Sequence, residues 1–143
     1  VRVVNKIGCV SGCMACTIYG TFDLMMTPKK KITAVFYRLS SGKEPVRDWL
    51  LSLTQEDRQT IGQDIMAVEF GWPCGEPLCK SLSSYPGLWE VRSSIRSGIA
   101  RVFFYIDKSE MILLHGMVKK TQKTPDRDLK LAQKRKTEYE RNG

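Results

Sequence analysis

The amino-acid sequence predicts one small α+β domain, with an antiparallel or mixed sheet, a helix hairpin on one face and a C-terminal helix. Three observations lead to this prediction. The chain has 143 residues and is 42% hydrophobic, which is enough for one buried core. Its periodic segments suggest one strand, two helices, three strands and a final helix. Short turns join the last three strands, which favours antiparallel neighbours.

The domain is expected to span residues 32–143, after a poorly ordered extension formed by residues 1–31. Three glycines interrupt any regular period in the extension, and the lysines at 29–31 close it. The first segment with a core-facing pattern begins after them. We therefore expect a natural start at Met25 or Met26.

Five cysteines occur in the chain, and three of them cluster in the extension, at Cys9, Cys13 and Cys16. An odd number without a convincing export signal predicts reduced thiols in the cytosol and no disulfides. Two alternatives stay open. The cluster could bind zinc, with Cys74 or Cys79 as a distant fourth ligand. The residues before Cys13 also resemble a lipoprotein cleavage site, although their apolar stretch is too short for a normal export signal.

The first half of the domain is expected to contain one strand and two helices. Residues 32–39 are rich in Val, Phe, Tyr and Thr, which favours a strand. Pro45 suits a first helical turn, and apolar residues follow it at helical spacing. Thr54 is a candidate N-cap for a second helix that ends at Gly71. These two helices are predicted to form the hairpin.

The second half is expected to contain a meander and one helix. Residues 71–87 are rich in glycine and proline and predict a loop of about 15 residues. Strands are predicted at 88–93, 99–106 and 111–118. Pro125 then opens a helix with one apolar face and basic residues around it.

Alternation along these three strands divides their side chains between two faces of the sheet. The face expected to pack against the helices is apolar: Trp89, Val91, Val102, Phe104, Ile106, Ile112, Leu114, Gly116 and Val118. The opposite face collects Arg92, Arg101, Tyr105, His115 and Lys119 beside a single acid, Glu90. We expect this second face to be solvated and to bind a polyanion.

The net charge of +8 is unevenly distributed, which supports a nucleic-acid partner. Residues 115–143 carry nine Lys/Arg and four Asp/Glu, whereas residues 32–114 carry nine and ten. A nearly neutral body with a basic end favours polyanion binding, because each neutralised phosphate releases counterions. The cations expected to contact RNA are Lys80, Arg96, Lys120, Lys123 and Lys130. No run of about 18 apolar residues occurs, so we expect no membrane span.

Three sequence segments point to a known family. They are Leu-Trp-Glu-Val-Arg at 88–92, Ala-Arg-Val-Phe-Phe at 100–104, and Leu-Leu-His-Gly-Met-Val-Lys-Lys-Thr-Gln-Lys-Thr-Pro at 113–125. In this order they resemble the phage-related, HigB-like branch of the RelE toxin superfamily. The resemblance extends over about residues 32–139, and its most specific part begins at His115.

This resemblance implies a cytoplasmic type II toxin that cleaves messenger RNA, commonly on the ribosome, and is neutralised by a helix-turn-helix antitoxin. It implies cleavage without a metal or cofactor, with the substrate 2′-hydroxyl as nucleophile and a 2′,3′-cyclic phosphate as product. Arg92 and Arg101 would stabilise the developing charge, and His115 or Tyr105 would transfer a proton. Lys119 and the lysines after it would hold flanking phosphates.

Other interpretations stay open. A related branch of the same fold inhibits DNA gyrase without cleaving RNA, and a non-enzymatic accessory protein would need only the basic face. His115 could be a hydrogen-bonded packing residue. Arg92 and Arg101 could be structural partners of Glu90, and the lysines near the C-terminus could be a solvated helix face.

Overall fold

The computed structural model describes residues 28–120 and 123–142. In chain order its elements are β1 (Thr33–Phe36), α2 (Pro45–Ser52), α3 (Gln55–Gly71), β2 (Cys79–Ser81), β3 (Trp89–Ile95), β4 (Gly98–Asp107), β5 (Glu110–Lys119) and α4 (Asp126–Asn142). This order confirms the predicted α+β class. The expectations for residues 1–27, including the cysteine cluster and the start site, lie outside the described residues.

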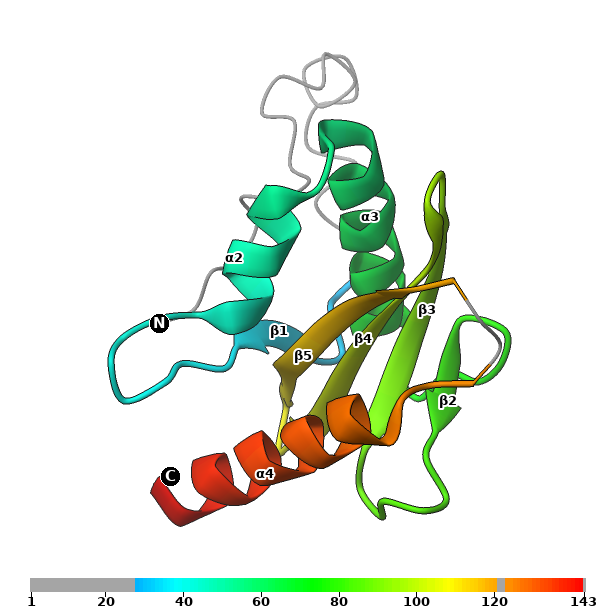
Figure 1. Cartoon of the computed structure of the whole chain (residues 1–143). Helices are drawn as coiled ribbons and strands as arrows, with labels where there is room; N and C mark the ends of the chain where they lie inside the picture. The colour runs from blue at the N-terminus through cyan, green and yellow to red at the C-terminus, as the bar shows by residue number, and fades with distance from the viewer. Residues whose placement is uncertain (1–27, 121–122, 143) are drawn as a thin grey trace.

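The sheet has five strands in the order β1-β5-β4-β3-β2. β1 pairs with β5 in parallel, and the other neighbours are antiparallel, so the sheet is mixed. Figure 1 shows α2 and α3 on one side of the sheet and α4 on the other. The domain therefore has three layers, and the predicted meander of β3, β4 and β5 is confirmed.

The ends of the first two helices follow from single residues. Pro45 lies in the first turn of α2, where its missing N–H removes no hydrogen bond. The Thr54 side chain accepts a hydrogen bond from the backbone N–H of Asp57 at 3.2 Å, which confirms it as the N-cap of α3. α3 ends at Gly71, as predicted.

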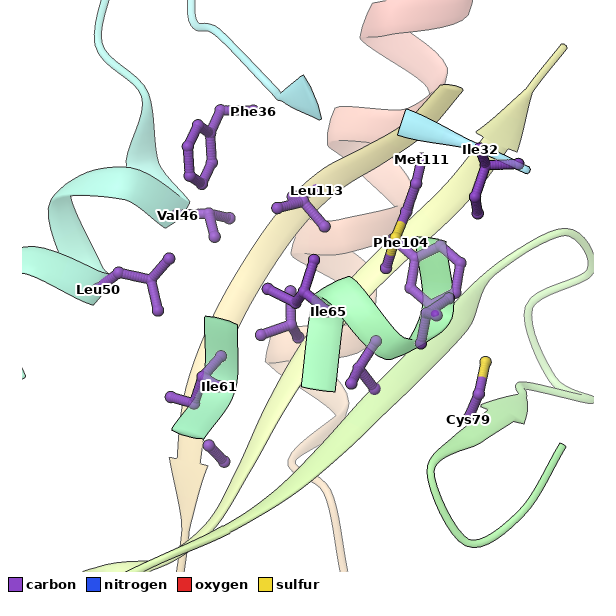
Figure 2. Packing of buried hydrophobic residues seen from close by; sticks show 14 residues of the cluster. Ile32, Phe36, Val46, Leu50, Ile61, Ile65, Cys79, Phe104, Met111 and Leu113 are labelled. Carbon is purple, nitrogen blue, oxygen red and sulfur yellow. The ribbon is translucent and has the colours of Figure 1, made fainter. Parts of the chain in front are cut away.

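The larger apolar core fills the space between the sheet and the pair α2 and α3. Figure 2 shows Val46 and Leu50 of α2 and Ile61 and Ile65 of α3 directed at the strands. Phe104 of β4 is fully buried on the opposite side of this core. The predicted helix hairpin therefore covers the predicted apolar face of β3 and β4.

A second apolar cluster lies under α4, on the face that we expected to be solvated. It contains Phe103, Tyr105, Ile112 and Leu114 from the sheet and Ala132 from α4. The expectation of a solvated face is therefore wrong for this part of the sheet. The physical reason is that the apolar side of α4 needs a partner, and the sequence left open which surface it would cover.

The predicted alternation in β5 is also wrong, because a β-bulge interrupts it. The pairing of β4 with β5 shifts between Phe103 and Phe104, so β5 contains one extra residue at that point. As a result Met111 and Leu113 join the core under α2 and α3. Ile112 and Leu114, for which simple alternation predicts that core, pack under α4 instead.

The segment predicted as one long loop contains a short strand. β2 pairs with β3 through Cys79 opposite Val91 and Ser81 opposite Trp89. Arg92 then donates its backbone N–H to the carbonyl oxygen of Leu78 at 2.9 Å. β3 continues to Ile95, beyond the reach of this short edge strand.

Candidate functional site

A groove of about 570 Å³ lies where the turn between β3 and β4 meets the end of β5. Its lining residues are Arg92, Ser97, Gly98, Ile99, Arg101, Lys119 and Lys120. Arg92 lies opposite Arg101 in the sheet, and Ile99 lies opposite Lys119. Alternation along β4 places Arg101 on the same face as Phe103, so the groove extends the face that α4 covers elsewhere.

Gly98 allows the turn to approach β5 closely. Its φ is +140°, a conformation that side chains disfavour, and a Cβ atom at this position would lie 2.6 Å from the carbonyl oxygen of Lys119. The glycine therefore sets the distance between the turn and the strand that carries Lys119.

Glu90 holds the two arginines in place. Its side chain is only 1% exposed, and it accepts hydrogen bonds from Nε of Arg92 at 2.7 Å and from a terminal nitrogen of Arg101 at 2.8 and 2.9 Å. The side chains of Arg92 and Arg101 are 27% and 12% exposed. Both therefore have a buried anchor and a remaining surface toward the groove.

Lys119 lies beside this pair and is itself buried, with 5% of its surface exposed. Burial lowers the pKa of its ammonium group, and the positive charges of Arg101 and Arg92 lower it further, against the opposing effect of Glu90. The groove thus brings three cations together around one carboxylate, and Lys120 adds a fourth, exposed cation. Such a site favours binding of a phosphate group.

His115 does not line this groove, because its ring belongs to the contact between β5 and α4. Its Nε2 lies 2.7 Å from an oxygen of Asp128, and its Nδ1 lies 3.3 Å from a guanidinium nitrogen of Arg135. The ring stacks on Phe103 with 6.1 Å between centroids. Burial is the main cause that lowers the pKa of His115. A neutral ring that donates to Asp128 and accepts from Arg135 fits these contacts.

Tyr105 lies deeper under α4 and is 6% exposed. The ring of Tyr139 meets it edge-on at 5.7 Å, and the ammonium group of Lys136 lies 5.4 Å from its centroid. Burial raises the pKa of the Tyr105 hydroxyl. Both proton-transfer candidates from the sequence thus lie outside the groove, while Arg92, Arg101 and Lys119 line it.

The cations expected to bind RNA are dispersed over the surface. Lys80 pairs with Glu76 at 3.5 Å, Arg96 with Glu56 at 3.4 Å, and Lys130 with Asp126 at 2.6 Å. Lys123 is exposed just before α4. Of the five predicted positions, Lys120 alone lines the groove.

Sequence reasoning missed two residues that fix His115. Asp128 lies in the first turn of α4, and Arg135 also donates to the backbone carbonyl of Leu114 at 2.8 Å. Both belong to the C-terminal run, where nine Lys/Arg and four Asp/Glu lie close together and no one of them is distinguished by the pattern. Their role depends on α4 covering this face, which the sequence pattern did not indicate.

Metal and membrane features can be stated for the described residues. Within residues 28–120 and 123–142, no three or more His, Cys, Asp or Glu side chains gather in a way that could hold a metal ion. Cys74 and Cys79, the two cysteines in this part of the chain, are free thiols. Among the described helices, none has the length and apolarity that a membrane crossing needs.

A family model of known proteins matches most of the domain. The family model described as phage derived protein Gp49-like (DUF891) matches residues 48–137. This span begins in α2, ends in α4 and includes every residue that lines the groove. A search of curated proteins gives no significant match.

Proposed function

Because the chain belongs to the phage-derived Gp49-like family of RelE/HigB-like toxins from type II toxin–antitoxin systems, we propose that it is an endoribonuclease that cleaves messenger RNA. Cleavage takes place on the ribosome and needs no metal ion. A helix-turn-helix antitoxin made with the toxin is the partner that neutralises it. The phage-related, HigB-like branch is the one whose sequence pattern the chain resembles.

The observation that carries this proposal is the groove with Arg92 and Arg101 anchored on Glu90. Two guanidinium groups held by a buried carboxylate are preorganised, so little reorganisation is needed when negative charge develops on a bound phosphate. Planar guanidinium groups also match two phosphate oxygens at once. A general anion-binding surface would not need this buried anchor.

The proposed reaction is an internal transfer at phosphorus. The substrate 2′-oxygen forms a bond to phosphorus while the bond from phosphorus to the 5′-oxygen breaks, which leaves a 2′,3′-cyclic phosphate. Lys119 is the proposed proton carrier: its neutral amine accepts the 2′-proton, and the resulting ammonium group gives a proton to the 5′-oxygen. Its lowered pKa favours this role, because a carrier must exchange its proton near neutral pH.

Metal independence is supported by Glu90, because the oxygens of its carboxylate already accept hydrogen bonds from arginines. Both oxygens of Glu90 already accept hydrogen bonds from Arg101, and one of them also accepts from Arg92. The cations thereby supply the charge stabilisation that Mg²⁺ provides in metal-dependent nucleases.

The test is single-turnover cleavage of messenger RNA on translating ribosomes, with mapping of the RNA ends. We expect Arg92→Ala or Arg101→Ala to lower the cleavage rate by roughly 10²–10³, the usual loss for one preorganised donor. Arg47→Ala is the matched control, since Arg47 is a half-exposed arginine on α2, away from the groove. Thermal melts establish that each variant is folded.

Two results would contradict the proposal. One is wild-type cleavage by folded Arg92→Ala and Arg101→Ala variants. The other is intact RNA together with inhibition of DNA gyrase by the wild-type protein, which would place the chain with the non-nuclease toxins of this fold.

A further inference from the structure

A second groove, of about 560 Å³, adjoins the groove lined by Arg92, Arg101 and Lys119, which is called the cationic groove below. Its lining residues are Thr60, Asp64, Pro77, Leu78, Arg92, Ser94 and Ile99. Arg92 and Ile99 line both grooves, so the two are adjacent. If a phosphate of a nucleic acid lies at Arg92, the groups next to that phosphate therefore lie beside the second groove.

The short length of β2 explains why the second groove exists. β2 stops pairing with β3 at Val91, and the last contact of this segment is the hydrogen bond from Arg92 to Leu78. β3 continues to Ile95 with β4 on its other side. The groove is thus lined by the part of β3 that β2 does not pair with, by α3 and by the residues just before β2.

The lining has an apolar part on which a flat ring can pack. Ile99 is 43% exposed and is one of two large apolar side chains that are exposed in the described part of the chain. Pro77 and Leu78 are the other apolar residues of the lining. Because Ile99 lines both grooves, it offers apolar surface at their junction.

Apart from Arg92, which also lines the cationic groove, the charged part of the lining is one carboxylate. Asp64 lies on α3, and within the described residues its carboxylate has no hydrogen bond or ion pair. The Thr60 hydroxyl donates to the carbonyl of Glu56 at 3.1 Å and so presents its lone pairs to the groove. A carboxylate only accepts hydrogen bonds, so the groove selects a ligand that donates them.

We propose that the second groove binds the base next to the scissile phosphate of the RNA and that Asp64 selects bases with an exocyclic amino group. Adenine, cytosine and guanine present such a donor, and uracil has none. This inference rests on the proposed function, since it takes RNA as the ligand of the cationic groove. Asp64 is a specificity-determining residue, and Ile99 supplies the apolar surface beneath the base.

The test compares two 2′-O-methyl RNA hexamers, one of adenosine and one of purine riboside. The two differ in the amino group alone, and the 2′-O-methyl groups block cleavage. Titrations followed by NMR up to about millimolar concentration cover the roughly 10⁻⁴–10⁻⁶ M range of non-specific nucleic-acid binding. We expect the wild-type protein to bind the adenosine hexamer about tenfold more tightly, within the discrimination that one base-edge contact provides.

The decisive quantity is the ratio of the two affinities in matched variants. Asp64→Ala should bring the ratio close to one, although the loss of a negative charge should strengthen binding of both hexamers. Asp48→Ala, which removes an exposed carboxylate from α2, should leave the ratio at its wild-type value. The ratio is therefore insensitive to the net charge and reports the contact at Asp64.

The outcomes separate this inference from the proposed function. If the wild-type protein cleaves RNA but its ratio is near one, or if Asp64→Ala keeps the wild-type ratio, the inference is wrong and the nuclease proposal stands. If the wild-type protein neither cleaves RNA nor binds either hexamer, both are wrong. A ratio that collapses in Asp64→Ala alone supports the inference.

Discussion

At the scale of single residues, Glu90 has the most consequential position in the groove. It is buried, and its charge is balanced by Arg92 of its own strand and Arg101 of the adjacent strand β4. Burial of a carboxylate costs free energy unless it is paired and hydrogen-bonded, and here the pairing also fixes Arg92 and Arg101. Glu90 thus contributes to the stability of the sheet and also fixes the positions of the two arginines in the groove.

We expect Glu90→Gln to lower both stability and activity. The amide keeps the shape but leaves two guanidinium groups without their anionic partner, so the free energy of unfolding should fall by about 2–3 kcal/mol. Urea unfolding measures this change, and single-turnover cleavage measures the activity. Glu56→Gln is the control, because Glu56 and Arg96 form an exposed pair whose loss should matter little. Equal losses in the two variants would contradict the anchoring role of Glu90.

At the scale of elements, α4 is fixed to the sheet by polar contacts around an apolar centre. His115 connects β5 with Asp128 and Arg135 of α4, and the Tyr37 hydroxyl donates to Glu138 at 2.8 Å. Ala132 lies fully buried between these contacts. His115 is therefore one of several side chains that hold α4 on the sheet.

Stability should accordingly depend on pH through His115, the one histidine of the chain. Burial lowers the pKa of this group below its ordinary value of 6.5. The unfolded chain then binds more protons than the folded chain just below pH 6.5. By linkage, the free energy of unfolding should fall as the pH drops through this region and should level off below the pKa of the folded state.

Urea unfolding between about pH 5 and 7, where most carboxylates stay ionised, measures this dependence. His115→Gln should be less stable at pH 7 and should show a flatter profile. A wild-type profile that rises toward low pH would contradict the assignment. Cleavage by His115→Gln, corrected for its folded fraction, should stay near the wild-type rate, since the ring lies outside the groove.

At the scale of the whole molecule, the positive charge should act mainly through the groove. The described basic residues include many that pair with acids of their own helix, such as Lys130 with Asp126 and Lys136 with Glu140. Such pairs have little net charge to offer a polyanion. The exposed Lys120, at the rim of the groove, is a stronger candidate for a phosphate contact.

Lys120→Ala should therefore weaken RNA binding at every sequence and reduce the salt dependence. The slope of the logarithm of the binding constant against the logarithm of the salt concentration should fall in magnitude by about one. Binding titrations at several salt concentrations give this slope. Lys43→Ala, an exposed lysine before α2, is the control and should leave the slope unchanged. A similar change in both variants would indicate a diffuse charge effect.

The sequence was sufficient for most elements of the fold, because their signals are local. Proline at the start of α2, the Thr54 cap and the alternation along β3 and β4 each predict a structure from neighbouring residues. The bulge in β5 left no local signal, so Ile112 and Leu114 were assigned to the wrong face. β2 was missed because three residues cannot establish an alternation.

The candidate site was predicted in part for the same reason. Arg92 and Arg101 were placed together correctly by strand pairing. His115 and Tyr105 were assigned to the same open face, but the placement of α4 depends on contacts between distant parts of the chain. Asp64 gave no signal in the sequence, since it lies on a helix whose relation to the edge of β3 follows from tertiary packing.

The parallel pairing of β1 with β5 also implies an order of events in folding. Paired strands of the meander are separated by only a few residues in the sequence. Thr33 of β1, by contrast, pairs with Glu110, which lies far along the chain. β1 leaves the ribosome early, yet its partner strand does not exist until much later in synthesis. The residues of the cationic groove all belong to the meander or its ends. The first strand to be made is therefore expected to pair only after the meander, whose residues form the groove, has been made.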